Sequence, residues 1–267
     1  MKFTKMQANG NDYVYTDVFE TPLIDPASAA IRWCDRHFGI GGDGLVLICP
    51  SDTCDFRMRI FDPDGTEAEV CGNALQCSAV LYSLSRKLRK KRVSVETLAG
   101  KRYVHTEWNG DALESVSVDL GTPKIEFLNR TVAIGEKFFP IASVSFGNPH
   151  CVVMAEDLSD EYFLRYAPIL ECHPLFPNRA NVEFVQVMDR CHLKMRTWER
   201  GCGETLSCSS GSGAALAAAK LSGLCEDEVM VEQRGGSIRC VWDEKNGCMK
   251  VYSKAIIVFD GSIEETE

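Results

Sequence analysis

The chain carries one set of motifs twice, at a nearly constant separation. MRIFDPDGTEAEVCGNALQC begins at Met58, and the similar MRTWERGCGETLSCSSGSGA begins 137 positions later, at Met195. GNDYV at Gly10 and GNPHCV at Gly147 have the same separation. Matches spread over most of both halves indicate a duplicated unit. We therefore expect two similar domains related by a pseudo-two-fold axis.

The joint between the copies is predicted within SVDLGTP, residues 117–123, where an alternating strand ends in a Gly-Thr-Pro turn. We assign residues 1–118 to the N-terminal half and residues 119–259 to the C-terminal half. Each half then has an ordinary domain size.

Short apolar and β-branched runs dominate both halves, and two helices interrupt them in each. Helices are expected from Asp25-Pro26 to about residue 37 and from Ser159 to about residue 170, and two more follow Cys71 and Cys208. Strands are expected at 46–49, 56–61, 93–96, 115–119, 182–187, 192–198, 229–232 and 255–259. This pattern predicts an α+β fold of two pseudo-symmetric domains, each a curved mixed β-sheet wrapped around a central helix.

Cys71 and Cys208 occupy the same place in the two copies, at or next to a helix N-terminus and after an acidic loop. Such a position is expected to lower the pKa of a thiol. The amides of Gly72-Asn73 and Ser209-Ser210 can bind a carboxylate there. A matched pair of acid/base groups suits inversion at a carbon stereocentre. One thiolate would remove the Cα proton while the other thiol delivers a proton to the opposite face.

Five ordered motifs cover essentially the whole chain: KMQANGNDYV, DGTEAEVCGN, GNPHCV, RANVEF and ERGCGETLSC. Together they resemble the diaminopimelate epimerase family, which works without pyridoxal phosphate in lysine and peptidoglycan precursor synthesis. The resemblance implies interconversion of LL- and meso-2,6-diaminopimelate by an isomerase. It also implies an active site in the interdomain cleft, and a C-terminal tail, 260–267, that returns to the first domain.

The resemblance also assigns site residues. It implies that Cys71 and Cys208 are the acid/base thiols, and that His150 and Glu199 act near the reacting amine and tune the site. The implied substrate contacts are Asn11, Asn148, Asn181, Glu199 and Arg200, with amides from Gly72 and Asn73.

The chain departs from the family pattern near the expected site. Asp62 stands where the family usually has Asn, and Gly44 stands where relatives often carry a longer side chain. The usual Cys-Gly-Ser/Thr-Gly becomes Cys208-Ser209-Ser210-Gly211. A carboxylate at Asp62 favours contact with an ammonium group. We hypothesise relaxed selectivity at the distal end of the substrate.

Composition limits the partners. The net charge of −9 argues against a nucleic-acid surface, and the basic run 86–92 fits a solvated helix end. The chain has no apolar stretch of about 18 residues and no secretory signal, which favours a cytoplasmic protein without a membrane span. Thirteen cysteines without a CxxC spacing favour neither disulfides nor a metal. We expect no cofactor, an amino acid as the substrate, and a homodimer.

Three alternatives stay open at this point. One is a racemase of the same fold with broader or different specificity, such as a glutamate, proline or hydroxyproline type. The second is a thiol redox protein in which Cys71 and Cys208 form a switching disulfide, and the third is a non-catalytic amino acid-binding protein. GIGGDG at 39–44 matches a dinucleotide fingerprint, but it precedes a strand instead of opening a helix, which argues against that function.

Overall fold

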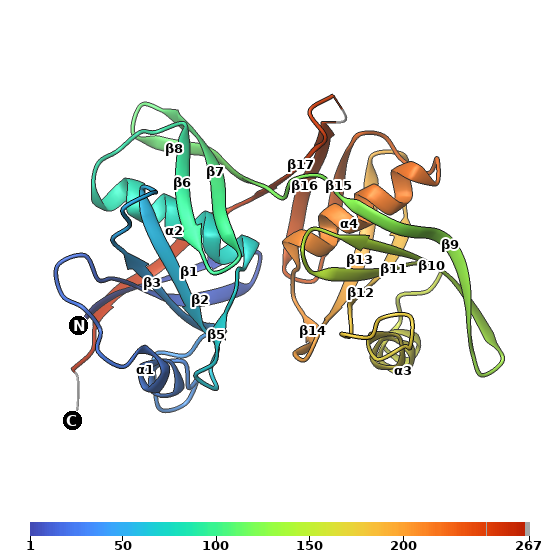
Figure 1. Cartoon of the computed structure of the whole chain (residues 1–267), viewed down its shortest axis with the longest axis horizontal. Helices are drawn as coiled ribbons and strands as arrows, with labels where there is room; N and C mark the ends of the chain where they lie inside the picture. Colours follow the sequence, from blue (N-terminus) through green and yellow to red (C-terminus); the bar gives the residue numbers. More distant parts are fainter. Residues whose placement is uncertain (244, 265–267) are drawn as a thin grey trace. The chain divides into compact units, whose positions relative to one another are not determined.

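The computed structural model describes residues 1–243 and 245–264. The chain divides into two compact units. Unit 1 comprises Met1–Val118 and the described residues from Ser253 onward, and unit 2 comprises Asp119–Tyr252. Each unit is a mixed β-sheet with two helices, which is the α+β fold expected from the sequence (Figure 1).

Unit 1 contains nine strands among its described residues. They are β1 (Lys2–Ala8), β2 (Asn11–Asp17), β3 (Gly44–Cys49), β4 (Phe56–Phe61), β5 (Glu67–Ala68), β6 (Arg92–Thr97), β7 (Gly100–Asn109), β8 (Ala112–Asp119) and β18 (Ala255–Ser262). The order across the sheet is β18-β1-β2-β3-β4-β6-β7-β8, with β5 paired to β4. The pairs β2/β3 and β4/β6 are parallel, and the others are antiparallel.

Unit 2 repeats this arrangement. Its strands are β9 (Lys124–Ile134), β10 (Lys137–Ser145), β11 (Pro149–Met154), β12 (Asn181–Val187), β13 (His192–Glu199), β14 (Gly203–Thr205), β15 (Glu228–Gln233), β16 (Gly236–Asp243) and β17 (Cys248–Ser253). They lie in the order β9-β10-β11-β12-β13-β15-β16-β17, with β14 beside β13, and among the described pairs β11/β12 and β13/β15 are parallel while the others are antiparallel. Tyr13 pairs with Gly44 in unit 1, and His150 pairs with Asn181 in unit 2, so even the register repeats.

The edge strand that pairs with β1 in unit 1, and its counterpart that pairs with β10 in unit 2, come from different parts of the chain. In unit 2 it is β9, which directly precedes β10 in the chain, whereas in unit 1 it is β18 from the C-terminal end. Strand β18 pairs with β1 from Ala255 opposite Ala8 to Ser262 opposite Lys2, and the register skips Val258 at a bulge. The tail that joins the first half is therefore longer than the expected 260–267, and residues 255–259 do not belong to the C-terminal half. Residues 265–267 of the expected tail lie outside the described residues.

A central helix is buried in each unit: α2 (Gly72–Ser85) in unit 1 and α4 (Ser209–Leu221) in unit 2. Figure 1 shows α4 running between the strands of its unit. Both helices are rich in small residues, which lets strands approach closely on several sides. A Cβ added at Gly213 would lie only 2.9 Å from Leu120 and 3.0 Å from Met249. A helix that is apolar around most of its surface is stable only when it is enclosed in this way.

The two other helices, α1 (Pro26–Trp33) and α3 (Asp160–Glu171), pack against β3 and β4 and against β12 and β13. Their N-caps are the expected ones, because Asp25 accepts the Ser28 amide and Ser159 accepts the Tyr162 amide. Helix α1 ends at Trp33, earlier than expected from the sequence. The Asp35 carboxylate accepts the amides of His37 and Phe38 at 2.7 Å, which replaces the last helical turn by a side-chain-capped turn.

Candidate active site

The thiol of unit 1 lies at the start of α2. Cys71 is the N-cap of this helix in an extended conformation (φ −133°, ψ 126°), and it is partly exposed. Its Sγ lies 3.5 Å from Asn11 Oδ1 and 3.5 Å from the Tyr13 hydroxyl. Asn73 Nδ2 donates to the same Asn11 oxygen at 3.4 Å. The structure thus brings together three residues predicted from the sequence and adds Tyr13.

A network of charged residues holds Asn11. The Asp43 carboxylate accepts Asn11 Nδ2 at 2.8 Å and the Asp12 amide at 3.0 Å. Arg36 bridges Asp12 and Asp43, and Lys5 pairs with Asp12 at 2.6 Å. Burial pushes the pKa of Asp12 upward, but Arg36 and Lys5 outweigh it and hold the pKa below its usual value. The Asn11 amide oxygen is therefore fixed in place beside the thiol.

The thiol of unit 2 lies at the start of α4. Cys208 is the N-cap of this helix (φ −129°, ψ 114°), and its Sγ accepts the Gly211 amide at 3.4 Å. Ser210 Oγ lies 3.6 Å from the same sulfur and accepts Asn148 Nδ2 at 3.3 Å. The Cys208 amide donates to Gln233 Oε1 at 2.9 Å, which anchors the cap to β15.

The pKa of the Cys208 thiol does not follow the sequence-based expectation. Burial raises it well above its usual value, and the charges of Glu199 and Glu183 raise it further. Ser210 and the Gly211 amide act in the opposite direction but do not offset these effects. Because desolvation of the buried thiolate outweighs the helix N-terminus, the expectation of a lowered pKa is wrong for Cys208.

Asn181, Glu199 and Arg200 gather around the ends of β11, β12 and β13. Asn181 Nδ2 donates to the Pro149 carbonyl at 3.2 Å, and its Oδ1 accepts the Arg200 amide at 3.0 Å. Glu199 accepts Thr205 Oγ1 at 2.7 Å, and the Arg200 side chain is exposed. Asn181 therefore positions the turn that carries Glu199 and Arg200.

His150 is fully buried on β11. Its Nδ1 lies 2.7 Å from Oε1 of Glu183, which is fully buried on the neighbouring strand β12. Tyr13 holds the equivalent position in unit 1, and its hydroxyl reaches Cys71. His150 thus occupies the place at which the other copy carries a partner of the thiol.

The departures at Asp62 and Gly44 have different settings. Asp62 is half-buried, and burial together with the charge of Asp64 raises its pKa. A Cβ at Gly44 would lie 2.6 Å from the Phe61 carbonyl and 2.9 Å from the Tyr13 ring. The space beside Gly44 is therefore filled by the protein, so this residue does not enlarge a substrate pocket.

The remaining predicted residues supply helix N-termini. Gly72 is the first residue of α2, and Ser209 and Ser210 are the first two of α4. Ser209 is buried, with 4% of its surface exposed, and Ser210 is partly exposed. In general, the amides of the first turn of a helix have no acceptor within the helix, and such turns can bind a carboxylate.

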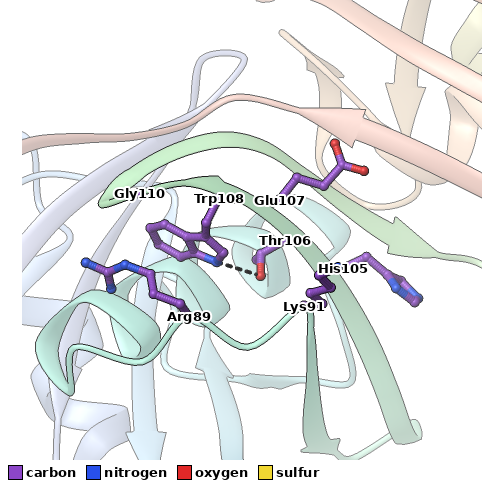
Figure 2. A pocket seen from close by; sticks show the side chains of 7 residues that line it. All are labelled: Arg89, Lys91, His105, Thr106, Glu107, Trp108 and Gly110. Carbon is purple, nitrogen blue, oxygen red and sulfur yellow. Dashed lines mark hydrogen bonds between the residues drawn. The ribbon is translucent and has the colours of Figure 1, made fainter.

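A pocket at the other end of α2 has no predicted site residue (Figure 2). It is lined by Arg89, Lys91, His105, Thr106, Glu107, Trp108 and Gly110. Figure 2 shows the Trp108 indole donating to Thr106 Oγ1, at 3.0 Å. Arg89 stacks on Trp108 and pairs with Asp111, and Lys90 pairs with Asp55. Acidic and aromatic partners thus hold part of the basic run in place.

Sequence reasoning missed several residues that support the thiols. Tyr13, Asp43, Glu183 and Gln233 all make contacts described above. The repeat offset could have revealed Tyr13, since this residue corresponds to His150 in the second copy. Glu183 lies inside the RANVEF motif, but nothing in its spacing marks a buried carboxylate.

No helix in residues 1–243 and 245–264 has the length and apolar character needed to cross a membrane. The same residues include no group of three or more His, Cys, Asp or Glu side chains arranged to hold a metal ion.

The fold places the chain in a known structural class. A PhzF-family phenazine biosynthesis protein of Bacillus anthracis superposes with a TM-score of 0.75 at 18% identity, over 99% of both chains. A hydroxyproline epimerase of Agrobacterium vitis superposes with a TM-score of 0.73 at 14% identity, over 98% of this chain and 91% of that one. At these identities the likeness establishes the fold alone.

The sequence identifies the family within this class. The diaminopimelate epimerase family model matches residues 3–126 and 142–255. The chain is 42% identical to the diaminopimelate epimerase of Acetivibrio thermocellus, with 100% of both chains covered. It is 43% identical to that of Desulforudis audaxviator, with 98% of both covered. The chain belongs to the diaminopimelate epimerase family, as its motifs predicted.

Proposed function

We propose that this chain is a diaminopimelate epimerase that interconverts LL- and meso-2,6-diaminopimelate in lysine and peptidoglycan precursor synthesis. One observation carries the proposal. In this chain, which belongs to the family, Cys71 and Cys208 are the N-caps of equivalent buried helices, and polar side chains surround each thiol. The family gives the substrate, and the paired thiols give the means of inverting its α-carbon.

The proposed reaction needs two proton transfers and no cofactor. One thiolate takes the Cα proton, so a Cα–H bond breaks and an S–H bond forms. The opposite thiol gives its proton to the other face of the carbon, and the roles exchange in the reverse direction. The amides that open α2 and α4 would stabilise the charge that develops on the α-carboxylate. The raised pKa of Cys208 supports a resting state in which this sulfur is a neutral thiol.

The surrounding residues are proposed to bind and orient the substrate. Asn11, Asn73 and Asn148 each have an amide group within hydrogen-bond distance of a thiol or of a residue that contacts one. His150 and Glu199 are proposed to act near the amine. Further substrate contacts are proposed for Asn181, Arg200, Gly72, Ser209 and Ser210. A cytoplasmic location remains part of the proposal.

A time course in D₂O tests this function. Incubation of LL-diaminopimelate with the wild-type chain should give meso product with one deuterium at the inverted carbon, followed by NMR. Cys71→Ala and Cys208→Ala should each lose overall epimerisation, because neither thiol alone can serve both faces. A wild-type chain that exchanges no Cα proton would overturn the proposal.

The range of substrates is a finer question. Asp62 and Ser209 support relaxed selectivity, whereas the packing of Gly44 gives it no support. Turnover of glutamate and other amino acids should be compared with that of diaminopimelate. Undetectable turnover of every other amino acid would rule out relaxed selectivity and leave the epimerase function intact.

We also propose that two copies pair through β18. In the described strand pairings of unit 1, β18 lies at the edge of the sheet and pairs with β1. Its consecutive residues Ile256, Ile257, Val258 and Phe259 are 43, 41, 54 and 45% exposed. Apolar side chains on both faces of an open edge favour pairing with another strand. A second β18 fits because two-fold symmetry makes the strand its own antiparallel partner.

Light scattering tests the dimer. The wild-type chain should have the mass of two copies, and Val258→Lys should shift it to one. Met188→Lys is the matched control, since Met188 is 58% exposed but lies in unit 2. A monomeric wild-type chain at micromolar concentration would contradict the proposal.

A further inference from the structure

The His150–Glu183 pair lies outside the polar groups that the thiol chemistry itself requires. His150 is on β11 and Glu183 on β12, and Nδ1 and Oε1 are 2.7 Å apart. Neither side chain has measurable exposure. A buried carboxylate is costly unless its charge is compensated, so a fold keeps one only where it has a role.

The fold itself does not require the pair. In the repeat, Tyr13 on β2 corresponds to His150, and Val46 on β3 corresponds to Glu183. Val46 is a fully buried apolar residue in the same parallel strand pair. Unit 1 thus builds the same strand pair with an apolar residue in place of the buried carboxylate, which indicates that Glu183 serves the chemistry of unit 2.

The pair lies beside the first turn of α4. A Cβ at Gly211 would lie 2.6 Å from Glu183 Oε1, so the carboxylate packs directly against this turn. The amide of Gly211 also donates to Cys208 Sγ at 3.4 Å. Glu183 therefore borders the backbone that holds the thiol, and its charge contributes to the raised pKa of Cys208.

One atom of each partner is left without a hydrogen bond. In the part of the chain that the structure describes, His150 Nε2 and Glu183 Oε2 are buried and have no partner. A carboxylate at Nδ1 requires a proton on that nitrogen, because an ionised carboxylate only accepts hydrogen bonds. The neutral imidazole then has its lone pair on Nε2. In this structure the lone pair on His150 Nε2 accepts no hydrogen bond.

We propose that Glu183 is a positioning residue for His150: it accepts Nδ1–H and thereby presents Nε2 as a hydrogen-bond acceptor for the α-ammonium group of the substrate. This inference rests on the proposed function for the identity of the substrate. The geometry of the pair does not depend on it. Glu183 acts through His150 and does not touch the substrate.

Imidazole NMR without substrate tests the tautomer. In the ¹⁵N-labelled wild-type chain, His150 should show a protonated Nδ1 and an unprotonated Nε2. The chain has five histidines, so the His150 signals are assigned by their loss in His150→Asn. Protonation at Nε2 with a bare Nδ1 would overturn the proposal, whether or not the chain turns over diaminopimelate.

Kinetics of Glu183→Gln test the consequence. We expect kcat/KM for diaminopimelate to fall about 10- to 100-fold, as for other partners that orient a functional histidine. The single His150 tautomer should be lost in the same variant. Glu126→Gln is the matched control, because Glu126 also lies in unit 2 and accepts one hydrogen bond, from Ser143. It should stay within about twofold of wild type. An unchanged kcat/KM in folded Glu183→Gln would refute the role of Glu183. If that variant does not fold, the tautomer of His150 in the wild-type chain decides whether the proposal stands.

Discussion

The two units share a strand order but differ where the thiols lie. Cys71 is partly exposed and contacts neutral groups, Asn11 and Tyr13. Cys208 is buried and lies in the field of two carboxylates, Glu183 and Glu199. Two copies of one scaffold thus place chemically similar sulfurs in electrostatically different surroundings.

The features that the units share are those that hold the backbone. Arg59 forms a two-bond fork with Glu67 at 2.7 and 2.8 Å, and Arg196 forms the equivalent fork with Glu204 at 2.9 and 2.9 Å. Both forks join β4 or β13 to the short strand beside it. The differences lie at side chains near the helix N-termini. Duplication therefore kept the scaffold and left the thiol surroundings free to diverge.

The largest functional contrast is expected between His150→Asn and Tyr13→Phe. His150→Asn should lower kcat/KM by about 100-fold, because it removes a buried group proposed to meet the substrate. Tyr13→Phe should cost only about fivefold, since it removes one weak hydrogen bond to sulfur of about 1 kcal/mol. Initial rates with diaminopimelate measure both. Equal losses in the two variants would mean that the units are functionally symmetric at this position.

The shared forks should differ in their contribution to stability. Arg196 is 8% exposed, and Arg59 is 32% exposed. Arg196→Met should destabilise the fold by about 2–3 kcal/mol, because it leaves Glu204 partly buried with Arg234 as its remaining cation. Arg59→Met should cost about 0.5–1 kcal/mol. Urea unfolding measures both, and a larger loss for Arg59→Met would contradict this ranking.

Much of the fold could be predicted from the repeat and from local patterns. The eight expected strands all lie within observed strands, and the N-caps at Asp25 and Ser159 are confirmed. Ten of the described strands were not predicted: β1, β2, β5, β7, β9, β10, β11, β14, β16 and β17. Of these, β5 and β14 span only two and three residues, which is too short for an alternating pattern to stand out. The pairing of β18 with β1 joins residues more than 240 positions apart, and local patterns carry no information on such partners.

The candidate site was only partly predictable for a similar reason. Motifs name residues, and Cys71 and Cys208 were found with their helix positions. Motifs do not report burial, which decides the pKa of Cys208 and the pairing of His150 with Glu183. The packing of Tyr13 against Gly44 likewise depends on three-dimensional proximity.

The burial of Cys208 predicts a dependence of stability on pH. A thiol whose pKa is raised by folding stabilises the native state below its unfolded pKa of about 8.5, and this contribution is lost as the pH rises above that value. Between pH 7.5 and 9.5 the wild-type chain should lose about 1 kcal/mol more than Cys208→Ala does.

Urea unfolding at the two pH values measures this difference, and other buried thiols cancel in the comparison. Cys71→Ala is the control, because Cys71 is partly exposed in the other unit. If the losses in wild type and Cys208→Ala were equal, Cys208 would titrate alike in the folded and unfolded chains.

The smallest effect on activity is expected at Asp62, which corresponds to Glu199 in the repeat. Asp62→Asn should raise KM for diaminopimelate by about two- to fivefold, since a half-buried carboxylate near an ammonium contributes no more than about 1 kcal/mol. Asp64→Asn is the matched control, because the Asp64 carboxylate is tied to Thr66 at the exposed tip of the same turn. It should leave KM unchanged. A lower KM in Asp62→Asn would show that the Asp62 carboxylate repels the substrate. Asp62 would then weaken substrate binding, whereas its counterpart Glu199 is proposed to contact the substrate.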